Sequence, residues 1–457
     1  MTRGIIHLSG TPGAWPGGPA PSYVRLSVRG IRGISGSYRS RKGWLAGAAG
    51  ACLLIAACSG GGGQTAGSAA RPEAGSAPPT ISPPGGSPGV SPQAPITVTA
   101  HAGSRIRSVQ VSTHGASVGG TLTADASRSR ATWHSTWALH PAQDYTVTAT
   151  TVDSAGRPVT RTTSFRTLAP DHTFRTHIYE GYGQTFGVGM PVILTFSHPI
   201  RNRAAVERAL QLRTSRPVTG AWYWDGNETL YFRPQNYWPP HTTVSVDAHL
   251  NGVEGAPGVY DRHDLTQTFR IGGSLIVTAS AATHRMHVYR NGHLRYTWPI
   301  STGRPGDDTP DGTYLTIDKG NPVLMTGPGY SLEVPWSVRF TWTGDYLHDA
   351  YWSVGEQGAV NVSHGCVNMA PADAQTYYQM ENPGDPVMIT GSPAAGTWDN
   401  GWTVWFLSWK KLVRGSALGM AVQAGPDGST FISPSSVPPS TASFPLQTAK
   451  PGSAGAA

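Results

Sequence analysis

Cysteine is scarce in this chain, with three in 457 residues: Cys52, Cys58 and Cys366. The first two lie in or beside an N-terminal export segment, so Cys366 is the one thiol left free for the folded protein. A single remaining cysteine cannot form an internal disulfide, which excludes a disulfide-stapled framework. Three interpretations stay open: a buried structural thiol, an intermolecular bridge, or a reactive group.

Charge is also sparse, at 13% of residues, and its sign is unevenly distributed. The formal net charge is +8. Seven basic residues precede position 58 with no acidic residue among them, so the remainder carries 8 − 7 = +1. A nearly neutral mature chain offers no electrostatic basis for binding nucleic acid. Those seven residues are Arg3, Arg25, Arg29, Arg32, Arg39, Arg41 and Lys42.

No apolar run is long enough for a mature transmembrane helix. The stretch 43–57 is short and follows the basic group Arg39-Ser40-Arg41-Lys42, which is typical of a secretion signal. It ends Leu53-Leu54-Ile55-Ala56-Ala57-Cys58, which is similar to a lipobox in which Cys58 is lipidated. We therefore predict a signal peptide over 1–57 and an extracytoplasmic lipoprotein anchored to the outer face of the cell membrane. The alternative is a plain signal peptide with Cys58 incidental.

Glycine and proline, by contrast, are abundant, with 57 and 38 residues. Gly, Ser, Ala and Pro dominate 58–95, which predicts a disordered linker. Short alternating runs bounded by turns follow, and predict a mainly β protein. The predicted divisions are an immunoglobulin-like domain over 96–168, a second over 169–273, a β-rich catalytic domain over 274–392, a helical extension over 393–424 and a disordered tail over 425–457.

Residues around Cys366 favour the reactive interpretation. A catalytic thiol needs a base, and its oxyanion needs aimed donors. His348 and His364 are candidate bases, and Gly365 permits a tight turn that points main-chain N–H groups at an oxyanion. Ser363 and Asn368 add donors on either side. A metal site built from the two histidines and Cys366 is the rival, but zinc sites favour closely spaced ligand pairs and a fourth ligand.

Three separate blocks then resemble a known family: 340–348 (FTWTGDYLH), 352–355 (WSVG) and 363–368 (SHGCVN). In this order, with the two histidines 364 − 348 = 16 apart, they resemble the L,D-transpeptidases of bacterial cell-wall synthesis, with a YkuD-type catalytic domain. The resemblance implies that Cys366 attacks a donor stem tetrapeptide and expels D-alanine. A diaminopimelate-type acceptor amine then forms a 3→3 cross-link. It also implies acylation of Cys366 by carbapenem-type inhibitors, and no metal or organic cofactor.

Carried over by position, the resemblance assigns roles to further residues. His348 is the general base and acid, and the N–H groups of Gly365 and Cys366, with the Tyr330 hydroxyl, stabilise the oxyanion. Substrate contacts are implied for Thr343, Gly344 and Asn368, and lid or wall positions for Met325 and Trp352. Tyr330 and Trp352 have the alternative of ordinary packing.

Asp349 is a departure from the family, because related enzymes often have serine there. The main-chain carbonyl at that position orients the histidine in the family and survives any substitution. The added carboxylate is expected to raise the pKa of His348 or to alter how its ring is held. Two other classes of function stay open: a same-fold carboxypeptidase or protein-anchoring enzyme, and a non-catalytic wall-binding lipoprotein.

Overall fold

A computed structural model describes residues 77–114, 116–124, 131–327 and 330–439 of the chain. The described part is mainly β, as predicted, with few and short helices. Cys58 and the predicted signal peptide lie outside the described residues. Among the described residues, no helix is long and apolar enough to cross a membrane.

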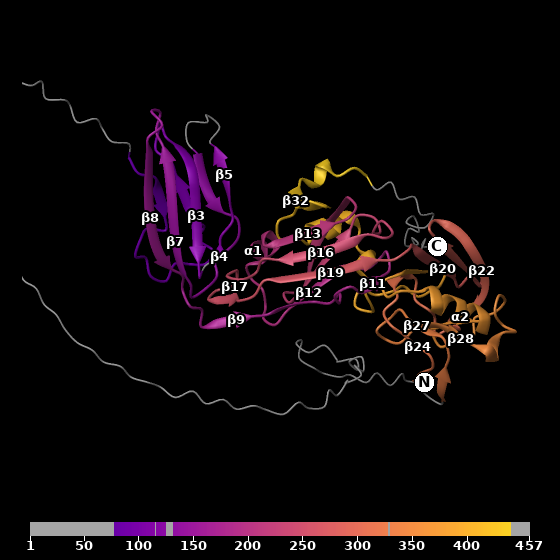
Figure 1. Cartoon of the computed structure of the whole chain (residues 1–457). Helices are drawn as coiled ribbons and strands as arrows, with labels where there is room; N and C mark the ends of the chain where they lie inside the picture. The colour runs from indigo at the N-terminus through magenta and orange to yellow at the C-terminus, as the bar shows by residue number, and fades with distance from the viewer. Residues whose placement is uncertain (1–76, 115, 125–130, 328–329, 440–457) are drawn as a thin grey trace, which may run out of the picture. The chain divides into compact units, whose positions relative to one another are not determined.

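The first unit is a small sandwich of two four-stranded sheets, whose strands lie side by side in Figure 1. Alternating burial along the strands puts one face of each sheet into a shared core that includes Val98, Val111 and Val147. One sheet contains β1 (Thr80–Ser82), β2 (Thr97–Thr99), β6 (Ala131–Ser135) and β5 (Gly120–Ala124); the other contains β4 (Ala116–Ser117), β3 (Arg105–Thr113), β7 (Asp144–Val152) and β8 (Pro158–Arg166).

The second unit is built on a ten-stranded sheet and a three-stranded sheet around one aromatic-rich core. Two of its sheet strands come from far along the chain and are described below. The others are β10 (Thr176–Ile178), β11 (Thr185–Phe186), β12 (Val192–Phe196), β13 (Leu210–Thr214), β14 (Val218–Asp225), β15 (Thr229–Pro234), β16 (Thr243–Ala248) and β19 (Leu265–Ile271). The three-stranded sheet contains β9 (His172–Phe174), β17 (Glu254–Ala256) and β18 (Val259–Asp261), and the helix is α1 (Arg203–Arg208).

The third unit carries the candidate nucleophile on a nine-stranded mixed sheet with its own core. In order across the sheet, the strands are β23 (Gly312–Leu315), β30 (Pro386–Thr390), β20 (Leu275–Ser280), β21 (Arg285–Arg290), β22 (His293–Ser301), β29 (Val367–Met369), β28 (Tyr346–Asp349), β27 (Ser337–Arg339) and β24 (Lys319–Gly320). A separate hairpin pairs β25 (Val323–Gly327) with β26 (Tyr330–Val334). The helices are η1 (Tyr351–Ser353) and α2 (Pro371–Met380), the latter opening with proline as the sequence predicts.

The predicted linker and C-terminal regions need correction. The predicted linker 58–95 is partly folded, because β1 pairs with β2 at the edge of the first sandwich. The predicted helical extension 393–424 holds only two short helices, η2 (Val404–Phe406) and α3 (Trp409–Arg414), and ends in strand. The predicted disordered tail starts too early, since β31 (Ala421–Gly425), β32 (Gly428–Ile432) and η3 (Pro434–Ser436) are ordered.

The C-terminal segment, residues 393–439, completes the second unit. Strand β31 lies between β14 and β13, antiparallel to the first and parallel to the second. The four tryptophans of this segment do not share one helix. Trp402 lies edge-on to Tyr179, and the Trp405 indole N–H donates to Gly189 O at 2.7 Å. Period-two signals in a Gly- and Ser-rich stretch were too weak to predict this strand insertion.

Candidate active site

Two neighbouring parallel strands bring the candidate base and nucleophile to one place. Strand β28 carries His348, and its register partner on β29 is Asn368. Cys366 immediately precedes β29, so it lies beside the strand that bears His348. Parallel pairing needs a long crossover, which here is the 350–366 segment containing η1 and the nucleophile turn.

The nucleophile turn, Ser363 to Cys366, is fixed by a set of short hydrogen bonds. Ser363 Oγ donates to Cys366 O at 2.6 Å and accepts the Gly365 N–H at 3.2 Å. Thr309 Oγ1 donates to Gly365 O at 2.6 Å. Gly365 has φ = +133°, which strains any residue bearing a Cβ. Its N–H is therefore committed to Ser363 in this arrangement.

The structure thus changes the expected oxyanion donors. The resemblance implied N–H groups from both Gly365 and Cys366. Across the described part of the chain, no acceptor bonds the Cys366 N–H, which leaves it for an incoming oxyanion. Tyr330 is 40% exposed on β26, and its ring lies 5.2 Å from that of His364. The Cys366 N–H is therefore a main-chain donor at this turn without a partner among the described residues, and Tyr330 stays a predicted donor.

His348 is held as a neutral base. Its side chain is 3% exposed, and its Nδ1 bonds the main-chain O of Asp349 at 2.7 Å. A carbonyl only accepts, so Nδ1 carries the proton and Nε2 keeps its lone pair. Burial lowers the pKa of His348 to about 4, opposed by that carbonyl. The ring is uncharged at neutral pH and able to accept a proton.

Cys366 is a protonated thiol in the resting enzyme. Burial raises the pKa of Cys366 to about 12, with the N–H of Tyr346 lowering it and the charge of Asp345 raising it further. The Sγ donates to Gly344 O at 3.9 Å. The resting pair is therefore a neutral thiol and a neutral imidazole. The thiolate must form during attack, when His348 takes the proton.

Asp349 does not act on His348 as expected. The pKa of His348 is lowered rather than raised, and the group of Asp349 that bonds its ring is the main-chain carbonyl. The Asp349 carboxyl is 5% exposed, and within the described residues its Oδ1 has no hydrogen-bond partner. Burial raises the pKa of this carboxyl, which favours its neutral form.

The other predicted contacts differ in their availability to substrate. Trp352 lies stacked 5.8 Å from the His348 ring and is 45% exposed, forming a wall beside the base. Met325 is half-buried on β25, opposite Leu332 of β26, in the hairpin predicted as a lid. Asn368 is 3% exposed and donates to Ser353 Oγ at 2.9 Å, so that amide N–H braces η1 instead of facing substrate.

Thr343 and Gly344 belong to a turn that a distant residue fixes. Asn400 Oδ1 accepts the Thr343 N–H at 3.0 Å, and Asn400 Nδ2 donates to Thr343 Oγ1 at 2.9 Å. Sequence reasoning missed Asn400 because nothing in its neighbourhood signals a contact 57 residues away. It also missed Asp345, which stood inside the first family-like block without an assigned role.

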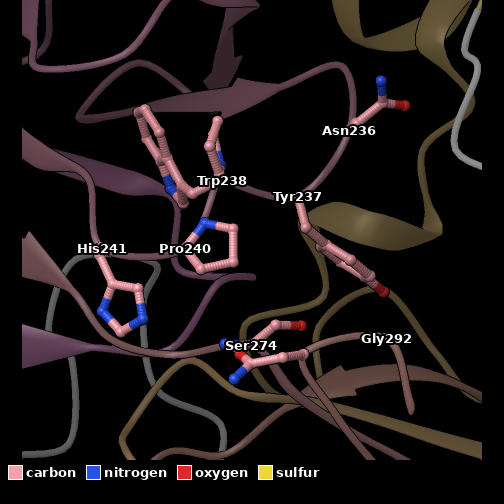
Figure 2. A pocket seen from close by; sticks show the side chains of 9 residues that line it. Asn236, Tyr237, Trp238, Pro240, His241, Ser274 and Gly292 are labelled. Atoms are coloured by element: carbon pink, nitrogen blue, oxygen red, sulfur yellow. Dashed lines mark hydrogen bonds between the residues drawn. The ribbon is translucent and has the colours of Figure 1, made fainter.

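One pocket lies away from these residues, with a cavity volume of about 560 Å³. Figure 2 shows Trp238, His241 and Ser274 around it. No predicted site residue lines it. In the part of the chain that the structure describes, no group of three or more His, Cys, Asp or Glu residues is placed to hold a metal ion.

Comparison with known proteins finds two domain models that match this chain. The model for the L,D-transpeptidase catalytic domain matches residues 274–389, and one for a bacterial Ig domain matches 87–254. The Ig match spans most of both N-terminal units. L,D-transpeptidase 2 of Mycobacterium tuberculosis is 32% identical over 338 residues, covering 70% of this chain and 82% of the relative.

Two further relatives are similar. L,D-transpeptidase 5 of Mycobacterium tuberculosis is 34% identical over 341 residues, covering 72% of this chain and 74% of the relative. A solved structure of the LD transpeptidase LdtMt1 in complex with imipenem is 36% identical, covering 48% of this chain and all of that one, with a TM-score of 0.41. The fold and the site define a cysteine acyltransferase of the cell wall. This chain belongs to the L,D-transpeptidase family.

Proposed function

We propose that this L,D-transpeptidase forms 3→3 peptidoglycan cross-links by a thioacyl-enzyme route through Cys366 and His348. The observation that carries the proposal is the tautomer of His348, which leaves Nε2 as a base on the strand beside the nucleophile. The predicted export segment and the names of the relatives support the substrate class, a stem peptide of the cell wall.

In the first half-reaction, His348 Nε2 takes the Cys366 thiol proton as Sγ attacks the carbonyl carbon of the third stem residue. The Cys366 N–H and the Tyr330 hydroxyl donate to the oxyanion. As the tetrahedral intermediate collapses, the peptide C–N bond breaks. The imidazolium returns its proton to the departing D-alanine amine, leaving a thioester on Cys366.

In the second half-reaction, the side-chain amine of a diaminopimelate-type acceptor attacks the thioester carbon and gives a proton to His348. The C–S bond breaks, and the sulfur recovers a proton from the imidazolium. Water in place of the amine gives a carboxypeptidase. The neutral His348 can receive the proton that either acceptor must lose, so the choice between amine and water depends on the shape of the cleft.

Mass spectrometry of the purified enzyme with a disaccharide-tetrapeptide tests this proposal. We expect a dimer mass that is absent in Cys366→Ala. Dimer formation by that variant would refute the assignment of the nucleophile. Tripeptide without dimer would instead identify a carboxypeptidase, and the alternative of attaching a protein to the wall predicts a peptide–protein adduct.

We also propose that carbapenem-type β-lactams acylate Cys366, because a thiol beside a base opens a strained lactam by the first half-reaction. The expected result is a stoichiometric mass increase on the peptide containing Cys366. A folded His348→Ala variant should acylate much more slowly than the wild type. Equal acylation rates in the two would contradict the role given to the base.

The proposed location is the outer face of the cell membrane, with the protein held by lipid on Cys58. The lipobox-like sequence before Cys58 supports this proposal. In cells, Cys58→Ala should move the protein from the membrane fraction to the soluble fraction. The matched control is Cys52→Ala, which should leave it membrane-bound, and unchanged fractionation of Cys58→Ala would refute the lipid anchor.

A further inference from the structure

A carboxylate with no assigned role lies against the nucleophile turn. Asp345 precedes β28, and hydrogen bonds hold both its side chain and its main chain. Its Oδ2 accepts from Thr341 Oγ1 at 2.8 Å, and its main-chain N–H donates back to the same hydroxyl at 2.8 Å. Its main-chain O accepts the Phe340 N–H at 3.0 Å. The side chain therefore has one defined position.

The Asp345 carboxyl lies beside Gly365, the residue before Cys366. A Cβ built on Gly365 would lie 2.5 Å from Asp345 Oδ1, so the carboxylate occupies the space that any other residue at 365 would fill. The residue before it, Gly344, supplies the carbonyl that accepts the Cys366 thiol proton. The same turn thus presents a hydrogen-bond acceptor and a carboxyl group to the nucleophile. Burial raises the pKa of Asp345, and the hydrogen bonds from Thr341 and Thr343 oppose this by stabilising the carboxylate.

Few other charges face the thiol. Tyr346 and His348 come from β28, Tyr330 from β26, and His364 from the nucleophile turn itself. Burial keeps His348 neutral, because it lowers the pKa to about 4. Burial also raises the pKa values of Tyr330 and Tyr346, so both phenols are neutral at physiological pH.

We propose that Asp345 is a positioning residue that adds to burial in keeping resting Cys366 a neutral thiol, so that a thiolate forms only when His348 removes the proton during attack on a bound substrate. The charge of a carboxylate this close disfavours a second negative charge in a poorly solvated site. An exported enzyme gains from this arrangement, because the thiolate, and not the thiol, is the form that oxidants and alkylating agents attack.

A network of hydrogen bonds connects Asp345 to the C-terminal segment. Asn400 forms two hydrogen bonds with Thr343, and Thr343 Oγ1 lies 3.3 Å from Thr341 Oγ1. Thr341 in turn holds the Asp345 carboxylate. The segment that inserts β31 into the second unit therefore also fixes the charge beside the nucleophile.

The proposal rests on Cys366 as the nucleophile of the proposed function, but it is tested without substrate, by alkylation of the full chain. The peptide containing Cys366 is quantified by mass spectrometry after timed exposure to iodoacetamide, which is neutral, or iodoacetate, which is anionic. For Asp345→Asn we expect an iodoacetamide rate about tenfold above the wild type, corresponding to roughly one pKa unit. The matched control is Asp373→Asn, on α2, in which we expect Cys366 to be alkylated at the wild-type rates.

The ratio of the two rates separates a charge effect from a loosened turn. Loss of a nearby negative charge should raise the iodoacetate rate several-fold more than the iodoacetamide rate. Unchanged rates, or an equal rise with both reagents, in folded Asp345→Asn would overturn the proposal.

Should that variant not fold, Thr341→Val frees the carboxylate from its hydroxyl, with an expected rise of about threefold in the iodoacetamide rate. A folded Thr341→Val with wild-type rates would also overturn it. A Cys366→Ala variant that still forms dimers would refute the proposed function instead.

Discussion

Glu180 makes the stability of the second unit depend on pH. Its side chain is fully buried in the turn after β10; Oε2 accepts the Ile193 N–H at 3.3 Å, and Oε1 has no partner among the described residues. Burial raises the pKa of Glu180 to about 8, from 4.5. An ionised carboxylate at this position would have too little compensation for the water it loses.

The direction of the pH effect follows from proton binding. Below pH 4.5 the folded and unfolded chains both hold the Glu180 proton, and the stability contribution is fully present. Between pH 4.5 and about 8 the unfolded chain has released it and the folded chain retains it, so the free energy of unfolding falls as pH rises. Over roughly 3.5 units, at about 1.36 kcal/mol each, the loss approaches about 5 kcal/mol. Above pH 8 the contribution is constant.

Urea unfolding at pH 5, 6.5 and 8 measures this effect in the wild type and in Glu180→Gln. The variant cannot ionise, so its free energy of unfolding should fall less over this range, by an amount close to the Glu180 contribution. The matched control is Glu333→Gln, at an exposed position on β26, with wild-type pH dependence. Other buried carboxyls act equally in all three proteins and cancel. If wild type and Glu180→Gln lose stability in parallel, Glu180 is not a buried neutral acid.

Three further predictions concern the site and the core. His348→Ala should lower the rate of cross-linking by about 10²- to 10⁴-fold with the fold intact, and a loss under tenfold in a steady-state assay would refute the general-base role. Asn400→Ala should lower kcat for cross-linking about tenfold with little change in melting temperature. Asn400→Asp keeps the acceptor for the Thr343 N–H, so its kcat should fall less. An equal loss of kcat in both variants would contradict the bracing role of Asn400. Trp238 is buried, and its indole N–H donates to Met190 O at 2.5 Å, so Trp238→Ala should cost about 3–5 kcal/mol and Trp238→Phe less. A loss below about 1 kcal/mol for the alanine variant in denaturant unfolding would refute this.

Local sequence was enough to predict the chemistry. The order of the three family-like blocks carried the resemblance to the L,D-transpeptidases, which the comparisons confirm, and that resemblance implied the nucleophile and the base. Alternation of period two gave the β class.

Contacts between distant segments needed the folded chain. Insertion of β31 between β14 and β13 depends on strands some 200 residues away, so no local pattern could distinguish it from a polar tail. The same holds for the hydrogen bond between Asn400 and Thr343, which are 57 residues apart.

Residue types and spacing by themselves predicted that Cys366 is the reactive thiol, and the family resemblance implied that His348 is its base. Only the tertiary structure decided the protonation of both groups and the position of Asp345 beside them. The physical reason is that pKa values depend on burial, hydrogen bonds and nearby charge, which several segments of the chain create together.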